Sequence, residues 1–238
     1  MENKVLHKAN TRGHANHGWL NAYHSFSFAS WHNPERVQFG VLRVLNDDNV
    51  AAGMGFGTHP HDNMEIITIP LQGDLAHKDS MGNAATIKTG DVQVMSAGTG
   101  IQHSEFNPNH DQQTKLFQIW LFPKVRNVAP RYQQITIDTS EQKNNFAQIL
   151  SPNEDDAGVW IHQDAWFHLA DFEKDFSKTY TLKKVGNGMY VFVISGEISV
   201  DEQALETRDG FGITDFETLE IKATTDAKFL LMEIPMNQ

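Results

Sequence analysis

Cysteine is absent from this chain of 238 residues, and its absence excludes disulfide bonds, thiolate zinc sites and a cysteine nucleophile. The chain also lacks any apolar run near the roughly 18 residues that a membrane-spanning helix needs. Its first twenty residues, MENKVLHKANTRGHANHGWL, contain no apolar core of a secretory signal. We therefore expect a soluble, cytoplasmic protein without a membrane partner.

Basic side chains are few. The chain has 19 lysines and arginines against 30 aspartates and glutamates, for a net charge of −11, and it contains no long block of like charge. Such a surface repels a phosphate backbone, so we expect no nucleic-acid partner. The acidic surplus is best explained by solubility.

Long helical periodicity is also lacking, and short segments rich in β-branched and aromatic residues dominate instead. They are residues 36–45, 65–71, 92–96, 114–122, 190–195 and 229–234. Turn-forming residues punctuate them at 45–49, 80–83, 88–91, 186–188 and 208–210. The stretch 155–172 fits either a short helix or a loop and a strand. The pattern predicts an all-β fold, a sandwich or barrel.

The chain contains an internal repeat. Residues 64–75 (MEIITIPLQGDL) resemble residues 189–200 (MYVFVISGEISV), with glycines at the matching positions Gly73 and Gly196. Two further matches follow in the same order: TGD at 89–91 with TRD at 207–209, and KLFQIWLFP at 115–123 with KFLLMEIP at 228–235. Ordered anchors of this kind favour duplication over chance. We predict two tandem barrels, residues 1–135 and 136–238.

Twelve histidines stand out, and ten of them lie in the first 110 residues. His59 and His61 are two residues apart, so on a strand both face one side. His103 and Glu105 repeat that spacing. Two such pairs on neighbouring strands could form a site of three imidazoles and one carboxylate. These ligands suit one divalent ion of Fe, Ni, Cu, Mn, Co or Zn with open coordination positions.

Two glycine-bounded segments carry these pairs and resemble the two cupin motifs. The first reads G-x5-H-x-H-x3-E from Gly53 to Glu65, and the second has Ser96 where the usual proline stands. More specifically, four segments resemble the pirin family and its bacterial members described as quercetin 2,3-dioxygenases. They are RGHANHGWLNAYHSFSFASW (12–31), GTHPH (57–61), DSMGN (79–83) and MSAGTGIQHSEFNP (95–108).

The resemblance implies a double cupin whose N-terminal barrel holds one metal through His59, His61, His103 and Glu105. Iron is the first expectation, with the other ions as alternatives. The generic cupin pattern would instead make Glu65 the carboxylate ligand, and its strand parity allows this. The resemblance selects Glu105 and leaves Glu65 either to orient a histidine or to lie on the surface.

The remaining histidines have simpler interpretations. We expect His14, His17 and His24 to pack or form hydrogen bonds near the barrel mouth. His162 and His168 are expected to lie in an aromatic stretch between the barrels.

The repeat predicts that the C-terminal barrel holds no metal. Alignment on the glycines places Leu182 and Lys184 opposite His59 and His61. Alignment on the TGD and TRD segments places Ile221 and Ala223 opposite His103 and Glu105. None of these four side chains can rebuild the site.

The resemblance implies an enzyme that cleaves flavonols such as quercetin with dioxygen and releases carbon monoxide, with Glu105 as general base. Candidates for an apolar pocket wall are Phe56, Met95, Phe117 and Ile119, although for each one ordinary barrel core is the favoured alternative. We expect a monomer.

Two other functions remain open at this stage. The resemblance also allows a metal-binding regulatory protein that acts through a protein partner, with flavonol cleavage as a side activity. A sugar isomerase or another metal-dependent cupin enzyme would need a polar barrel lining. The aliphatic run at 65–71 argues against such a lining.

Overall fold

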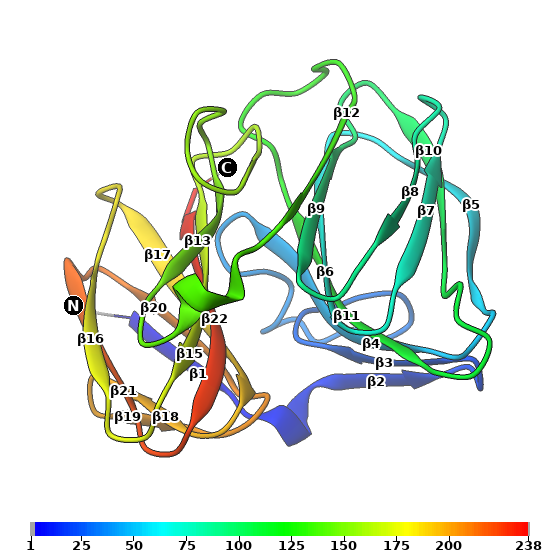
Figure 1. Ribbon diagram of the computed structural model, residues 1–238. Helices are drawn as coiled ribbons and strands as arrows, with labels where there is room; N and C mark the ends of the chain where they lie inside the picture. Colours follow the sequence, from blue (N-terminus) through cyan, green and yellow to red (C-terminus); the bar gives the residue numbers. More distant parts are fainter. Residues whose placement is uncertain (1–2, 238) are drawn as a thin grey trace.

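Two β-barrels lie side by side in the computed structural model, which describes residues 3–237 (Figure 1). Each barrel has one seven-stranded sheet and one four-stranded sheet. The only helices among the described residues are two 3-10 turns, η1 (Ala9–Thr11) and η2 (Thr139–Gln142). The architecture confirms the predicted all-β double cupin. In this part of the chain, no helix is long and apolar enough to span a membrane.

The first barrel contains the histidine pairs. Its seven-stranded sheet has the order β12-β9-β6-β11-β4-β3-β2, and its four-stranded sheet has the order β5-β10-β7-β8. The strands are β2 (Gly13–Asn16), β3 (Leu20–His24), β4 (Leu42–Val50), β5 (Gly55–His61), β6 (Glu65–Gln72), β7 (Leu75–Asp79), β8 (Ala84–Ile87), β9 (Asp91–Ser96), β10 (Ile101–Phe106), β11 (Thr114–Leu121) and β12 (Arg131–Thr136).

The second barrel repeats this arrangement except at the two edges of its large sheet, where one pair of strands is parallel and one strand comes from the start of the chain. Its sheets have the orders β1-β20-β17-β22-β15-β13-β14 and β16-β21-β18-β19. The strands are β1 (Asn3–His7), β13 (Ala147–Ser151), β14 (Val159–Trp160), β15 (Trp166–Phe172), β16 (Ser177–Thr181), β17 (Asn187–Ser195), β18 (Ile198–Val200), β19 (Gln203–Leu205), β20 (Gly210–Thr214), β21 (Thr218–Ala223) and β22 (Ala227–Pro235). The matching orders agree with the duplication inferred from the repeat.

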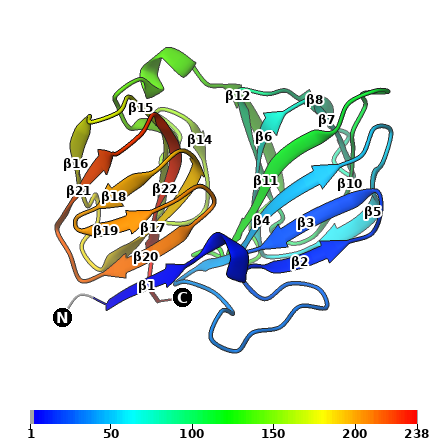
Figure 2. The same cartoon turned by 90° about the horizontal axis from the view of Figure 1, so that it is seen from below.

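The first strand of the chain belongs to the second barrel. β1 pairs antiparallel with β20, from Asn3 opposite Thr214 to His7 opposite Gly210, and Figure 2 shows it running alongside that barrel. It occupies the edge position that β12 occupies in the first barrel. The predicted division near residue 135 therefore does not apply to β1, because the chain begins in one barrel and crosses to the other.

Strand β4 differs most from the sequence-based expectation. Residues 45–49 (LNDDN) were predicted to form a turn after a strand at 36–45. They instead lie inside β4, which ends at Val50, and Asn46, Asp47 and Asp48 are buried. Strand pairing with β3 and β11 on both sides holds this segment extended. Tertiary pairing has thus overridden the turn preference of Asn and Asp.

One face of the first barrel's large sheet packs against the second barrel. A single apolar cluster includes Leu45, Ile67 and Phe117 from the first barrel together with Phe192 and Leu230 from the second. The rings of Phe117 and Phe192 meet edge to face at 5.3 Å between centroids. Burial of this apolar area is the main force that joins the barrels.

An ion-pair group crosses the same interface. Asp47 Oδ2 accepts from Arg12 Nη1 at 3.2 Å and lies 3.1 Å from Arg208 Nε. Asp47 is directly opposite Phe117 in the β4–β11 pair, and the Arg208 guanidinium lies over the Phe117 ring. The buried carboxylate therefore has two cationic partners from different segments, as burial of a charge requires.

The interface generates a stability prediction. We expect Phe117→Ala to lower the free energy of unfolding by about 3–5 kcal/mol, because it leaves a cavity in the shared core. Chemical denaturation of the metal-free protein measures this change. The control is Phe106→Ala, whose side chain is exposed and whose loss should change stability by less than about 0.5 kcal/mol. A loss below about 1 kcal/mol for Phe117→Ala would contradict this account of the interface.

Candidate metal centre

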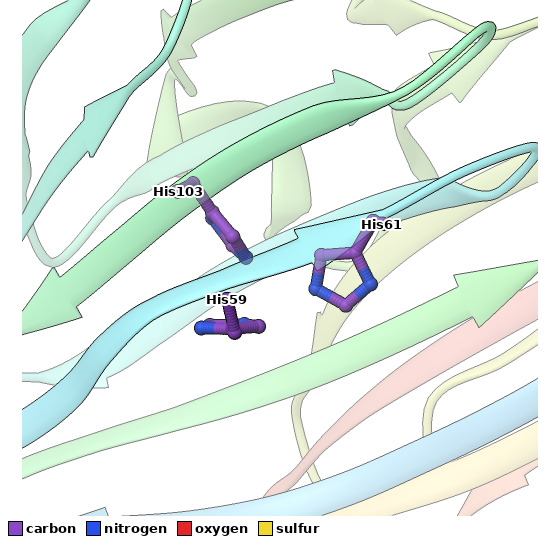
Figure 3. A group of neighbouring side chains, drawn as sticks. All are labelled: His59, His61 and His103. Atoms are coloured by element: carbon purple, nitrogen blue, oxygen red, sulfur yellow. The ribbon is translucent and has the colours of Figure 1, made fainter.

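Three of the four predicted ligands meet in the first barrel. His59 and His61 lie on β5, and β10 pairs with β5 so that His103 is opposite His59. The centroids of the rings of His59 and His103 are 4.4 Å apart, and both lie 4.9 Å from the centroid of His61. Each ring offers a nitrogen within 4.8 Å of the other two. Figure 3 shows the three rings gathered at one point.

The protonation of these rings suits metal binding. His59 Nδ1 lies 2.8 Å from Gly57 O. A carbonyl oxygen only accepts, so Nδ1 carries the hydrogen and Nε2 keeps its lone pair. Burial, followed by the neighbouring His59, lowers the pKa of His61 to about 4. Burial and the adjacent histidines lower the pKa of His103 to about 3. At neutral pH the rings of His61 and His103 are therefore neutral, which is the form that binds a metal.

His103 provides the test of fit. Its side chain is buried, and neither of its ring nitrogens has a hydrogen-bond partner among the described residues. A buried imidazole without partners is costly unless something else satisfies it. A divalent transition ion bound by three neutral nitrogens would do so.

Glu105 lies beside this cluster rather than within it. Its carboxylate groups with His77 and His103, with one potential ligand atom of each within 4.8 Å of the others. Both of its oxygens accept from Gln118 Nε2, at 3.3 and 3.1 Å. Burial raises the pKa of Glu105 to about 7, although the bond from Gln118 opposes that rise. The carboxyl group is therefore balanced between its protonated and ionised forms near neutral pH.

His77 is a buried residue of the site that the sequence did not single out. It lies on β7, and its ring centroid is 5.3 Å from that of His103. His77 Nε2 lies 3.2 Å from Asp79 Oδ2, and the other oxygen of Asp79 accepts from the backbone of Met81 and Asn83. The DSMGN turn thus fixes Asp79, and Asp79 orients His77. The signal was another H-x-acid pair, His77–Asp79, at the same spacing as His103–Glu105.

A cavity of about 250 Å³ opens onto the cluster. All four predicted ligands line it, together with Leu20, Ala22, His24, Phe28, Asn46, Asp48, Phe56, Gln118 and Trp120. The volume is small for a ligand pocket and favours a compact ligand. Trp120 contacts His61 edge to face at 4.9 Å between centroids, and Phe28 contacts Trp120 in the same manner at 5.4 Å. Aromatic side chains therefore flank the imidazole end.

The opposite wall carries polar side chains from β3, β4 and β11, although most of the cavity surface is apolar. Of the four candidate wall residues, only Phe56 lines the cavity, and the other three lie in buried core clusters, which was the favoured alternative for each. Phe117 and Ile119 face the second barrel, and Met95 packs in a separate small cluster with Ile66. The aliphatic run at 65–71 did not predict the cavity lining, because Ile67 and Ile69 of β6 also face the second barrel. The barrel lining is supplied mainly by other strands.

Asp48 is the unusual group on that polar wall. It is 4% exposed. Burial, then the carboxylates of Asp47 and Glu105, raises the pKa of Asp48 to about 8. The carboxyl group is thus largely protonated at neutral pH.

Glu65 points elsewhere. It is buried and accepts a hydrogen bond from Ser96 Oγ at 2.6 Å. It does not line the cavity. Burial raises the pKa of Glu65, and the charge of Arg131 and a hydrogen bond with the His162 backbone oppose that rise. Glu65 therefore neither lies on the surface nor orients a histidine of the cluster, which were its two expected roles. Ser96, which replaces the usual cupin proline, is its partner.

The other histidines also have defined places. His24 lines the cavity, and its Nδ1 bonds to Asn46 Oδ1 at 2.8 Å. His14 bonds to Asn21 on the exposed side. The carbonyl of His162 accepts from Lys124 of the first barrel, and His168 is buried in β15 of the second barrel, against Tyr180.

The second barrel has different side chains at the corresponding positions. Ile221 pairs with Lys178 and Leu219 with Tyr180, as His103 pairs with His59 and Ile101 with His61. Strand pairing therefore places Lys178 and Tyr180 at the positions of His59 and His61. The sequence alignment had placed Leu182 and Lys184 there, and it was offset because the connection after β16 is longer than the one after β5. Ile221 and Ala223 belong to the apolar cluster that fills this barrel.

Comparisons with known proteins agree with this architecture. Residues 5–121 match the family model described as Pirin, and residues 148–234 match the model described as the quercetinase C-terminal cupin domain. The chain is 41% identical over 230 residues to quercetin 2,3-dioxygenase of Escherichia coli (strain K12), covering 97% of this chain and 98% of that protein. It is 40% identical to a pirin-like protein of Caulobacter vibrioides, covering 93% and 95%.

A solved structure supports the same family. The crystal structure of the bacterial pirin YhhW from Escherichia coli in complex with nickel(II) matches with a TM-score of 0.92 at 39% identity, covering 98% of this chain and 99% of that chain. Family, fold and histidine cluster together support a single divalent metal. On these matches, the chain belongs to the pirin family, as a bacterial member with two cupin barrels.

Proposed function

We propose that this protein is a metal-dependent dioxygenase that cleaves flavonols such as quercetin with dioxygen and releases carbon monoxide. The observation that carries the proposal is a single cavity that joins three converging imidazoles to a carboxyl group with a pKa near 7. The family membership and the names of the relatives support the same activity.

His59, His61 and His103 would hold the ion, with Glu105 as the fourth ligand. When bound, a divalent metal supplies a Lewis acid for the 3-oxygen and 4-carbonyl of a flavonol and an open position for dioxygen. Iron is our first expectation, and nickel is the ion bound in the Escherichia coli relative. The side chain of Glu105 borders His103 and the cavity, so it can serve both the ion and the substrate.

Glu105 would act as the general base. A flavonol must lose its 3-hydroxyl proton before its ring becomes electron-rich enough to react with dioxygen. A base works best when its pKa lies near the operating pH, and burial brings the pKa of Glu105 to about 7. Gln118 holds the carboxylate in place through its amide nitrogen. The carboxyl oxygen would take the proton, and the substrate would remain as the anion.

The walls would exclude water and orient the substrate. Leu20, Phe56 and Trp120 present apolar surface to the cavity, and flat aromatic rings pack well on such surface. Exclusion of water protects the anion of the substrate and strengthens its electrostatic contacts.

The first prediction concerns metal content. Replacing His59 and His61 together with Ala should abolish stoichiometric metal binding, because two of the three converging nitrogens are lost. Elemental analysis of protein purified without a chelating tag measures the content. The matched control is His14→Ala with His17→Ala, a histidine pair that does not line the cavity. One equivalent of metal retained in the His59/His61 variant would place the site elsewhere and would overturn the prediction of a metal-free second barrel.

The second prediction concerns the base. Glu105→Gln should lower the rate of quercetin cleavage by about 10²–10⁴-fold per bound metal, since an amide cannot accept the proton at neutral pH. An oxygen electrode records the rate, and elemental analysis supplies the normalisation. Glu65→Gln is the control, because that carboxyl group is also buried but lies outside the cavity. Equal normalised rates for Glu105→Gln and the wild type would remove Glu105 from the chemistry.

The third prediction concerns the substrate. Quercetin should lose its flavonol absorbance with release of carbon monoxide, whereas its 3-O-methyl ether should be inert because it has no 3-hydroxyl proton to give. Equal turnover of the two compounds is incompatible with the mechanism. Absence of turnover after reconstitution with each candidate metal would argue against the enzyme and for the regulatory alternative.

A further inference from the structure

His103 needs a hydrogen-bond acceptor when it binds an ion. An imidazole coordinates a metal through one ring nitrogen, and its other nitrogen then carries a hydrogen. The side chain of His103 is buried, and neither of its nitrogens has a hydrogen-bond partner among residues 3–237. An ion would satisfy one nitrogen and would leave the N–H of the other without an acceptor, which is costly at a buried position.

Three histidine rings lie beside His103, and only one of them has an acceptor to offer. His59 donates through Nδ1 to a backbone carbonyl and keeps Nε2 for the ion. His61 is the remaining imidazole ligand of that ion, so its second nitrogen also carries a hydrogen. His77 differs, because its Nδ1 is buried without a partner. One nitrogen of His77 lies within 4.8 Å of one nitrogen of His103.

Asp79 decides which nitrogen of His77 carries the hydrogen. Its Oδ1 accepts from the backbone of Met81 and Asn83, both at 3.0 Å, and its Oδ2 accepts from Asn83 Nδ2 at 2.8 Å. Three donors directed at this carboxylate favour its acceptor role, so the contact with His77 Nε2 at 3.2 Å is an N–H bond from the ring. Next to a divalent ion the ring is neutral, and its lone pair is then on Nδ1.

We propose that His77 and Asp79 are positioning residues of the metal centre and that they act through His103. With an ion bound, the free N–H of His103 donates to His77 Nδ1, and the N–H of His77 Nε2 donates to Asp79. These two bonds fix the tautomer and the orientation of the His103 ring and raise its basicity toward the ion, as outer hydrogen bonds do at metal sites. The DSMGN turn, residues 79–83, thereby gains a role, because its backbone holds Asp79.

The inference rests on the part of the proposed function that makes His103 a metal ligand. It holds whether or not the bound metal cleaves flavonols. What it adds is a second layer of residues, which sets how tightly the ion is held.

Strand pairing offers His77 another partner, Glu105. β7 and β10 pair so that Asp79 is opposite His103 and His77 is opposite Glu105, and one oxygen of Glu105 also lies within 4.8 Å of the two ring nitrogens. That carboxyl group already accepts from Gln118 Nε2, whereas His103 has no partner. The unsatisfied N–H of His103 therefore has the greater need of His77 Nδ1.

Metal affinity tests the proposal without turnover. His77→Phe keeps an aromatic ring but removes both nitrogens, so it should bind Ni²⁺ about 10- to 100-fold more weakly than wild type. His77→Asn places an acceptor oxygen near the position of Nδ1 and should recover most of this loss. Competition with a chelator of known affinity measures binding. The matched control is His168→Phe, at a buried histidine of the second barrel that also has one unpartnered ring nitrogen, and its Ni²⁺ affinity should equal that of wild type.

Nitrogen NMR of the zinc-loaded wild type locates the ring hydrogens directly. One N–H of His103 should exchange slowly with water, and His77 should carry its hydrogen on Nε2 alone. The His103 N–H should exchange faster in His77→Phe. A hydrogen on Nδ1 of His77 in the zinc-loaded wild type would sink the proposal, because His77 would then donate at that nitrogen instead of accepting.

The outcomes distinguish this inference from the proposed function. Unchanged Ni²⁺ affinity in His77→Phe, with quercetin still cleaved, would end the positioning role alone. Equal loss of affinity in His77→Phe and His77→Asn would assign the effect to packing and would also end it. Weaker binding in His77→Phe with recovery in His77→Asn, in a protein that cleaves no flavonol with any metal, would end the dioxygenase proposal and leave the positioning role intact.

Discussion

Strands β4 and β11 carry apolar side chains on the face toward the second barrel and polar side chains on the face toward the cavity. The rest of the molecule depends on this division. Because successive side chains of a strand point to opposite sides, Leu45 and Phe117 face the second barrel, while Asp48 and Gln118 face the cavity. One pair of strands thus supplies both the shared apolar core and the polar wall of the site. A shift of one residue in their register would bury the carboxyl group in the interface and expose the aromatic ring to the cavity.

The stability of the shared core allows the first barrel to hold groups that do not favour folding. The cavity contains a carboxyl group with a raised pKa at Asp48 and an imidazole without partners at His103. Each is costly in an unliganded protein. The large apolar interface and the ion pairs of Asp47 compensate on the other face of the same sheet. Because strands rather than loops carry most of the site, the imidazoles are preorganised for a ligand.

The second barrel shows what the same topology becomes without a site. Ile221 and Ala223 lie in its apolar interior, and one of its buried carboxylates, Glu233, is satisfied by Tyr180, Asn187 and backbone donors. Among residues 3–237, no buried side-chain oxygen of this barrel lacks a hydrogen-bond partner. The β1 strand at its edge comes from the start of the chain, so the two barrels are joined by chain connectivity as well as by packing.

The sequence alone determined the fold class, the duplication and the paired spacing of His59, His61, His103 and Glu105, because each is a local pattern with a period of two residues or a repeated motif. It did not reveal the LNDDN segment as a buried strand, since Asn and Asp favour turns until neighbouring strands pair with them on both sides. Nor did it separate Phe117, which faces the other barrel, from Phe56, which lines the cavity. The tertiary structure decided these points, because which face of a strand meets a cavity depends on how distant strands pair and pack.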